Sequence, residues 1–354
     1  MIKLDSSILK KGFFIGIILL VLFSGILYHS GFFYRVTYEY WLDIGRSHCL
    51  SGEYKQAISA LERAIEIIPN NPRGWGYKGN CLYLMNRTDE GLIAINKGIE
   101  VNPNDPQGWG NKGYFLYLLN QSEEALLAIN KAIELGEAIP NIRDEYMAQE
   151  WVMKCKILLN LNRKNEGLVA VNRALELNPD YMPGWYYKGY ILYELGKYKE
   201  SVKAYEKAAE LDSEDDYTWL HLGVSYSQVG MIEKEIVAYE KIIDNDKNPR
   251  LVAIALNNKG YALNKQGKNC EGLNAVNKAL ELNTSFGEFW DTKGRILSNL
   301  GRYEEALEAH DKAIELSPQN PDIWFGKSET LKKMGRIIES NTTYQKAYEL
   351  NKTL

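Results

Sequence analysis

Apolar and polar positions follow each other along residues 38–354 with the period of an amphipathic helix. In the stretch 198–211, Ser201, Tyr205, Ala208 and Leu211 fall on one helical face, while lysine and glutamate occupy the other. Sequences such as Leu-Asn-Pro and Leu-Ser-Pro end successive segments, since proline cannot continue a helix. Strand-like alternation followed by hairpin turns is absent from the sequence. The pattern therefore predicts an all-α protein.

The helical segments recur with a period that the tryptophans mark. Five of the seven gaps between consecutive tryptophans are 34 residues, one is 42 and one is 71. The longest gap divides into 37 and 34 if Leu256 takes the place of a missing tryptophan. A small residue, usually glycine, follows four residues after each of these positions, and a second small residue, usually alanine, follows after 23. The eight tryptophans are Trp41, Trp75, Trp109, Trp151, Trp185, Trp219, Trp290 and Trp324.

Self-similarity at this period indicates an array of helical repeats. Units of 34 residues begin at positions 38, 72, 106, 148, 182, 216, 253, 287 and 321. We expect repeats 1–3 over residues 38–139, repeats 4–6 over 148–249 and repeats 7–9 over 253–354. Two inserts, 140–147 and 250–252, separate these groups and should lengthen the first helix of the following unit. The nine units and two inserts account for every residue after 37.

This pattern resembles the tetratricopeptide repeat, with Trp-x2-Leu-Gly-x2-Tyr followed by Ala-x3-Phe, Ala and Pro. Trp185, Gly189, Ala208 and the stretch 306–313 (ALEAHDKA) carry the match. The resemblance implies a right-handed α-solenoid of nine helix-turn-helix repeats, whose concave side is lined by the first helices and binds protein or peptide partners. The sequence departs from the pattern where lysine precedes the glycine of several units: Lys78, Lys112, Lys188, Lys259 and Lys293.

The expected concave face is rich in tyrosine, which offers a large rigid contact area with a hydrogen-bonding tip. Packing against the adjacent helix is the alternative role for any one of these rings. Two asparagines match the pair with which some tetratricopeptide domains hold a terminal carboxylate, but Gly76, Gln149 and Met153 stand at the cationic positions, so we do not expect that grip. The candidate partner-binding residues are Tyr77, Asn80, Asn111, Tyr114, Tyr186, Tyr187, Tyr190 and Tyr261.

Residues 1–37 precede the repeats and contain a long uncharged segment, residues 12–34, whose first part reads GFFIGIILLVLFSGILY. This length can just span a bilayer, so we expect one transmembrane helix there and a single-pass membrane protein. Three lysines before the segment, against Arg35 and Arg46 after it, favour a cytoplasmic N-terminus and repeats on the extracytoplasmic side. A cleaved signal peptide is the alternative, but no Ala-x-Ala-like site follows the apolar run.

Composition and motifs narrow the function. A net charge of −4 and a pI near 5.8 argue against a nucleic-acid partner. The four cysteines form no C-x-x-C motif, and no histidine pairs with a second metal ligand at helical spacing. Hydrolase, Walker and zinc-protease motifs are absent from the sequence, and the repeats leave no room for a catalytic domain. We therefore expect no enzyme activity, cofactor, metal or small-molecule substrate.

These inferences together predict a membrane-tethered scaffold for protein–protein interaction, which binds peptide or protein segments on the concave face of the repeats. The alternative is a component of an envelope secretion or assembly machine with one dedicated partner set. In the last unit, residues 340–343 (SNTT) replace the ALEA of the eighth, as expected for a polar terminal repeat.

Overall fold

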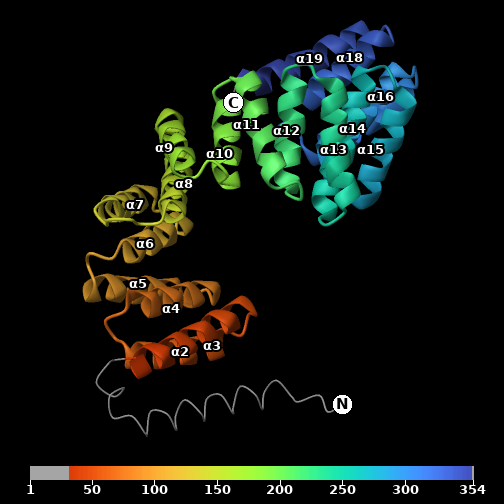
Figure 1. The fold of residues 1–354 in the computed structure, drawn as a ribbon. Coiled ribbons are helices and arrows are strands. Elements are labelled where there is room, and N and C mark those ends of the chain that lie inside the picture. Colours follow the sequence, from red (N-terminus) through yellow and green to blue (C-terminus); the bar gives the residue numbers. More distant parts are fainter. Residues whose placement is uncertain (1–31, 353–354) are drawn as a thin grey trace, which may run out of the picture. The chain divides into compact units, whose positions relative to one another are not determined.

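The computed structural model describes residues 32–352, which form eighteen helices and contain no β-strand (Figure 1). The predicted all-α class is therefore confirmed. The helices follow one another as nine pairs, and we call the first helix of each pair the A helix and the second the B helix. The pairs are α2 (Phe32–Leu50) and α3 (Tyr54–Ile67), α4 (Pro72–Leu84) and α5 (Thr88–Val101), α6 (Pro106–Leu118) and α7 (Ser122–Glu137), α8 (Asp144–Asn160) and α9 (Lys164–Leu177), α10 (Met182–Glu194) and α11 (Tyr198–Leu211), α12 (Asp216–Gln228) and α13 (Ile232–Asn245), α14 (Pro249–Lys265) and α15 (Asn269–Leu282), α16 (Gly287–Asn299) and α17 (Tyr303–Leu316), and α18 (Pro321–Lys333) and α19 (Ile337–Lys352).

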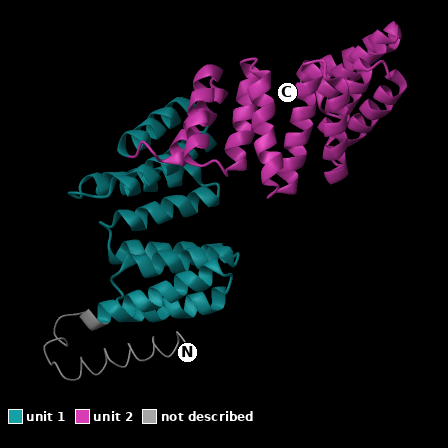
Figure 2. Cartoon of the chain, turned by 45° about the vertical axis from the view of Figure 1, so that its right-hand side comes forward, with its two compact units in different colours: residues 1–177 teal, residues 178–354 magenta. Residues whose placement is uncertain are grey.

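The chain divides into two compact units, residues 1–177 and residues 178–354 (Figure 2). The described part of the first unit holds α2 to α9, and that of the second holds α10 to α19. Within each unit we call the surface formed by the A helices the A-helix face. The two A helices that include insert residues, α8 and α14, each have 17 residues, whereas α4, α6, α10, α12, α16 and α18 each have 13.

The turn between the two helices of each pair requires one residue with positive φ. This residue stands at the fifteenth position of every unit, with φ between 57° and 79°. Glycine adopts that conformation without steric cost, and asparagine tolerates it better than other side chains. The residues are Gly52, Asn86, Asn120, Asn162, Gly196, Gly230, Gly267, Gly301 and Gly335.

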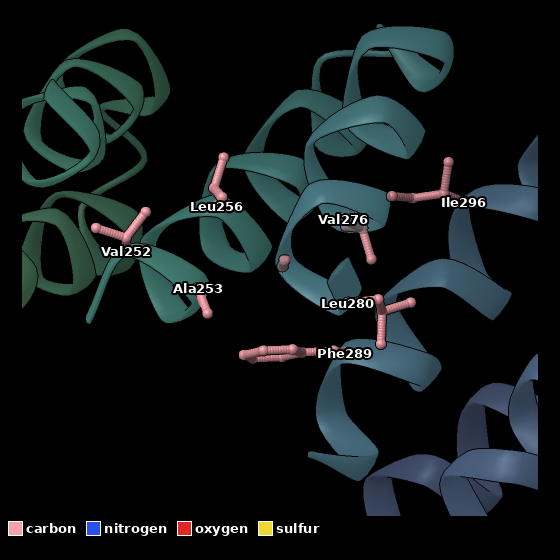
Figure 3. Close-up of a cluster of buried hydrophobic side chains, with 8 residues drawn as sticks. Val252, Ala253, Leu256, Val276, Leu280, Phe289 and Ile296 are labelled. Atoms are coloured by element: carbon pink, nitrogen blue, oxygen red, sulfur yellow. The ribbon is translucent and has the colours of Figure 1, made fainter. Parts of the chain in front are cut away.

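Small residues of the A helices allow bulky residues of the B helices to pack directly on the backbone. A Cβ atom at Gly189 would lie 2.8 Å from the Tyr205 ring, and one at Gly223 would lie 2.5 Å from Tyr239. The contact extends to the next pair, as Figure 3 shows for Leu256 of α14, Val276 of α15 and Phe289 of α16. Burial of such apolar surface stabilises the stack, since no single pair can cover its own apolar face.

The tryptophans connect each pair to the end of the preceding one. The indole Nε1 of six of them donates a hydrogen bond to the carbonyl oxygen six residues earlier, at 2.7 to 3.2 Å. Four of the lysines that depart from the family pattern lie over these rings, with Nζ between 5.1 and 5.9 Å from the ring centroid. Such a cation–π contact contributes roughly 0.5–1 kcal/mol at an exposed site. These lysines are Lys78, Lys112, Lys188 and Lys293.

The structure corrects the predicted localisation. The expected transmembrane segment, residues 12–34, lies outside the described residues except for its last three, which begin α2. That helix continues through Arg35, Glu39, Asp43 and Arg46, and charged side chains of this kind are excluded from hydrocarbon. Of the helices in residues 32–352, none has both the length and the apolar character needed to cross a bilayer. The single-pass membrane localisation, and with it the extracytoplasmic placement of the repeats, is therefore contradicted.

Candidate functional site

A polar cavity of about 250 Å³ opens on the A-helix face of the first unit. Three successive A helices form it: α4 contributes Arg73 and Tyr77, α6 contributes Gln107 and Asn111, and α8 contributes residues from its first two turns. Gly76 and Gly110 allow the three helices to approach this closely, because a Cβ atom at either position would meet a side chain of the next A helix. The residues from α8 are Tyr146, Gln149 and Glu150.

Glu150 is the acidic group of this cavity, and its pKa is strongly perturbed. A Cβ atom at Gly110 would lie 2.6 Å from Glu150 Oε1, so the carboxyl group packs against the bare backbone of α6. Burial raises the pKa of Glu150 to about 7, which outweighs the opposite effect of a hydrogen bond with Tyr146. The cavity therefore holds a carboxyl group that changes charge near neutral pH.

The cation of the same cavity is already engaged. Arg73 Nη1 donates to both carboxylate oxygens of Glu39 in α2, at 2.8 and 3.1 Å. This pair holds the guanidinium beside α2 and leaves Glu150 without a bound counter-charge. The cavity therefore presents hydrogen-bonding groups with little net charge.

A second polar cavity, of about 350 Å³, opens on the A-helix face of the second unit, between α14, α16 and α18. Lys333 Nζ donates to Asn299 Oδ1 at 2.6 Å, and Asn299 Nδ2 donates to Asn264 Oδ1 at 2.8 Å. Lys265 Nζ donates to Ser227 Oγ at 3.1 Å and lies 4.6 Å from the centroid of the Tyr261 ring. Both ammonium groups thus donate to neutral acceptors, and the one carboxylate of the lining, Glu329, lies 3.7 Å from Arg295 Nη1.

A charged network holds Arg295, one of the residues that line this second cavity. Arg295 Nε donates to Asp291 Oδ2 at 2.7 Å, and its Nη2 donates to the carbonyl of Asp322 at 2.6 Å. His310, fully buried, has Nδ1 at 3.0 Å from Asp291 Oδ1 and Nε2 at 3.1 Å from Thr330 Oγ1. The network fixes the direction of the arginine and positions α16 against α17 and α18.

Three of the sequence-predicted partner-binding residues line these cavities. Tyr77 and Asn111 meet in the first cavity, and Tyr261, 37% exposed, lies at the edge of the second. Asn80 is half-buried in α4, and Tyr114 of α6 is 40% exposed, but neither lines either cavity.

The three predicted tyrosines of α10 lie in a separate aromatic cluster. The Tyr186 ring packs edge-on against Tyr187, Tyr205 and His221, with centroid distances of 5.2 to 5.7 Å. Tyr190 contacts the same histidine at 6.1 Å. The structure therefore does not bring these rings into either cavity, and their role in binding stays a prediction.

Sequence reasoning missed most of the polar cavity residues. A signal existed, because the thirteenth position of the first three units is leucine, whereas the last three units carry Lys265, Asn299 and Lys333 there. In the first unit, the burial of Glu150 could not be predicted from its own repeat, because it depends on Gly110 of another repeat.

The structure pairs two of the four cysteines. Cys49 of α2 and Cys81 of α4 form a disulfide with their Cα atoms 6.0 Å apart. They stand at different positions of adjacent units, so spacing within the repeat could not pair them. Residues 32–352 contain no group of three or more His, Cys, Asp or Glu side chains arranged to hold a metal ion.

Family models match the chain over much of its length. A model described as TPR repeat matches residues 189–230 and 294–335. Two models described as Tetratricopeptide repeat match residues 50–112, and residues 106–137 and 321–354. A comparison with curated proteins finds no significant match.

Solved structures support the same fold. The crystal structure of the APC/C hetero-tetramer Cut9-Hcn1 is similar with a TM-score of 0.52 at 17% identity, covering 82% of this chain and 56% of that one. This chain thus spans about half the length of that relative. The structure reported for pilF of Pseudomonas aeruginosa is similar with a TM-score of 0.52 at 14% identity, covering 60% of this chain and 92% of that one.

Proposed function

This chain is a tetratricopeptide-repeat protein, and from that premise we propose that it is an interaction scaffold which binds peptide or protein segments on the A-helix faces of its two units. The observation that carries the proposal is the cavity between α14, α16 and α18, whose two lysines use neutral acceptors. A pre-organised polar cavity on rigid helices lowers the ordering cost of binding a flexible segment.

The charge of this cavity indicates what kind of side chain it suits. Three cations, Lys265, Lys333 and Arg295, line the cavity together with the bonded Asn264 and Asn299 amides, against the single carboxylate of Glu329. Amide N–H groups and ammonium groups together favour a carboxylate. We therefore propose that an acidic side chain of the bound segment occupies the cavity of the second unit.

The cavity of the first unit supports a second contact of different character. Tyr77, Asn111 and Gln107 offer neutral donors and acceptors, and the Glu150 carboxyl is close to half-ionised at neutral pH. We propose that it binds uncharged polar groups, such as the backbone amides of an extended segment.

Binding rather than catalysis also agrees with the burial of the groups that could do chemistry. His310 is fully buried, and the Thr330 hydroxyl beside it belongs to a side chain only 1% exposed. A nucleophile must reach its substrate, and this pair cannot without opening the helix stack.

The test uses the purified full chain and immobilised peptides that differ at one position between Asp, Glu, Asn and Gln. We expect preferential retention of the acidic peptides, and roughly fivefold weaker binding of them by Lys333→Met. Lys332→Met, a change at the exposed neighbouring position, is the matched control and should bind as the unsubstituted protein does. Equal retention of acidic and neutral peptides, or of Lys333→Met and Lys332→Met, would show that the cavity is not the docking site.

A further inference from the structure

One repeat carries a large acidic residue at a position where the others carry a small one. The twentieth position of each unit, in the first turn of the B helix, is glycine, alanine or serine in eight of the nine units. The sixth unit has Glu235 there, and the side chain is only 2% exposed. A carboxyl group buried in a small-residue position is costly unless something compensates for it. The eight small residues are Ala57, Gly91, Ala125, Gly167, Ser201, Gly272, Ala306 and Ser340.

Glu235 extends from α13 into a third cavity of about 270 Å³, on the A-helix face of the second unit. Tyr261 forms part of the lining here and also of the cationic cavity, so the two cavities lie on either side of this ring. The other polar lining groups are Ser227 and Gln228 of α12, Tyr239 of α13, Asn257 and Asn258 of α14, and Thr292 of α16. The volume suits a single side chain rather than a drug-sized ligand.

Two buried oxygen atoms of this lining have no hydrogen-bond partner. They are Glu235 Oε2 and Asn257 Oδ1. The Asn257 amide is oriented by its own donor, since Nδ2 donates to Asn258 Oδ1 at 3.2 Å, so the free atom is the acceptor. A buried polar atom without a partner costs about 1–3 kcal/mol. Both unpartnered atoms are acceptors, and a group that satisfies them must therefore bring donors.

We propose that the Glu235 cavity receives an arginine side chain of the segment bound on this face. The inference rests on the proposed function, since it names a second side chain of the same bound segment. A guanidinium group carries five N–H donors in a planar fork, which suits a carboxylate together with a nearby amide oxygen. The Tyr261 ring also lines this cavity, and the guanidinium would replace the Lys265 ammonium that now lies 4.6 Å from the ring centroid. A bound segment could then place an acidic side chain in the cationic cavity and an arginine in the Glu235 cavity.

Lys265 is the cation that competes for this position. Its ammonium bonds Ser227 Oγ at 3.1 Å, and Ser227 lines the Glu235 cavity. Burial raises the pKa of Glu235, whereas the charge of Lys265 and a hydrogen bond with Ser227 act in the opposite direction. The lysine is exposed and also lines the cationic cavity, so an arriving guanidinium can displace it there. Its removal should therefore strengthen arginine binding rather than weaken it.

The experiment titrates the purified full chain with N-acetyl-arginine amide and, as the neutral isostere, N-acetyl-citrulline amide. We expect the arginine compound to bind at least about tenfold more tightly, and Glu235→Ala to remove this preference. Alanine is the residue of three other units at this position, so the variant keeps the usual packing of the repeat. Glu233→Ala, on the same helix and exposed, should change nothing.

Two further readouts separate binding from a structural effect. Lys265→Met should increase the affinity for N-acetyl-arginine amide, and the affinity of the unsubstituted protein should rise with pH as Glu235 ionises. Equal binding of the two compounds, or unchanged arginine binding by Glu235→Ala, would overturn the inference. Retention of acidic peptides through Lys333 is read separately, so the two proposals can fail independently.

Discussion

The buried carboxyl of Glu150 provides a direct test of the first cavity through the substitution Glu150→Gln. Glutamine keeps the shape of the side chain against Gly110 but removes its charge. In the folded protein burial raises the pKa of Glu150 from 4.5 to about 7, so the folded state holds its proton to higher pH than the unfolded chain. Stability from this group is therefore complete below pH 4.5 and is lost as the pH rises to about 7.

The size of the effect follows from the difference between the two pKa values. Each unit corresponds to 1.36 kcal/mol, so ionised Glu150 destabilises the folded protein by about 3 kcal/mol above pH 7. The glutamine variant has no such penalty. We expect Glu150→Gln to stabilise the first unit by about 3 kcal/mol at pH 8, and by only about 1 kcal/mol at pH 5.

Hydrogen exchange on the full chain, measured at pH 5 and pH 8, is the suitable assay. Repeat proteins open locally, so the protection of amides in α6 and α8 reports the stability of the cavity more directly than a global midpoint. The control is Glu145→Gln in the exposed first turn of α8, where loss of a negative charge near the helix N-terminus should lower protection slightly.

An equal change in protection at both pH values would contradict a raised pKa of Glu150. A variant less stable than the unsubstituted protein at pH 8 would also contradict it, because the carboxylate would then be stabilised by a partner that glutamine cannot replace.

Three other predictions concern stability alone. Gly301→Ala should cost about 1 kcal/mol in urea unfolding, because the residue has φ of 76° with open space around it and only the backbone conformation is penalised; no loss would contradict this. His310→Ala should lower the unfolding free energy of the second unit by on the order of 3 kcal/mol, since it leaves a cavity and removes the group beside Asp291; a loss below about 1 kcal/mol would contradict that packing. Reduction of the Cys49–Cys81 disulfide, which closes a loop of 32 residues, should destabilise α2 to α4 by about 4 kcal/mol in calorimetry, and an unchanged transition would refute it.

The helical architecture was predictable because its determinants are local and repeated. Trp185, Gly189 and Ala208 recur in equivalent form in other units, so a single sequence contains several copies of the same signal. The lysines before the glycines read as departures from the family pattern. In the structure their ammonium groups lie over the tryptophan three residues earlier, a contact that spacing alone could have suggested.

The cavities were less predictable because they depend on which residues face each other across repeats. Positions 5 and 9 of the fifth unit indicated Tyr186 and Tyr190 as surface contacts, yet His221 of the next A helix packs against both rings. In contrast, Glu235 departs visibly from eight small residues in the aligned units. That departure marks a cavity, but only the neighbouring Asn257 and Tyr261 define its chemistry.

The tryptophan hydrogen bonds allow indole fluorescence to report on the contacts between successive helix pairs. Six indoles share one hydrogen bond, whereas Trp151, which follows the insert 140–147, has a buried Nε1 without a partner. Indole emission depends on hydrogen bonding at that nitrogen, so Trp151 should emit at a wavelength distinct from those six. Variants that each retain one tryptophan would then report the opening of one contact between successive helix pairs at a time. The spectrum of Trp151 would identify the contact after the insert, where the indole hydrogen bond is missing.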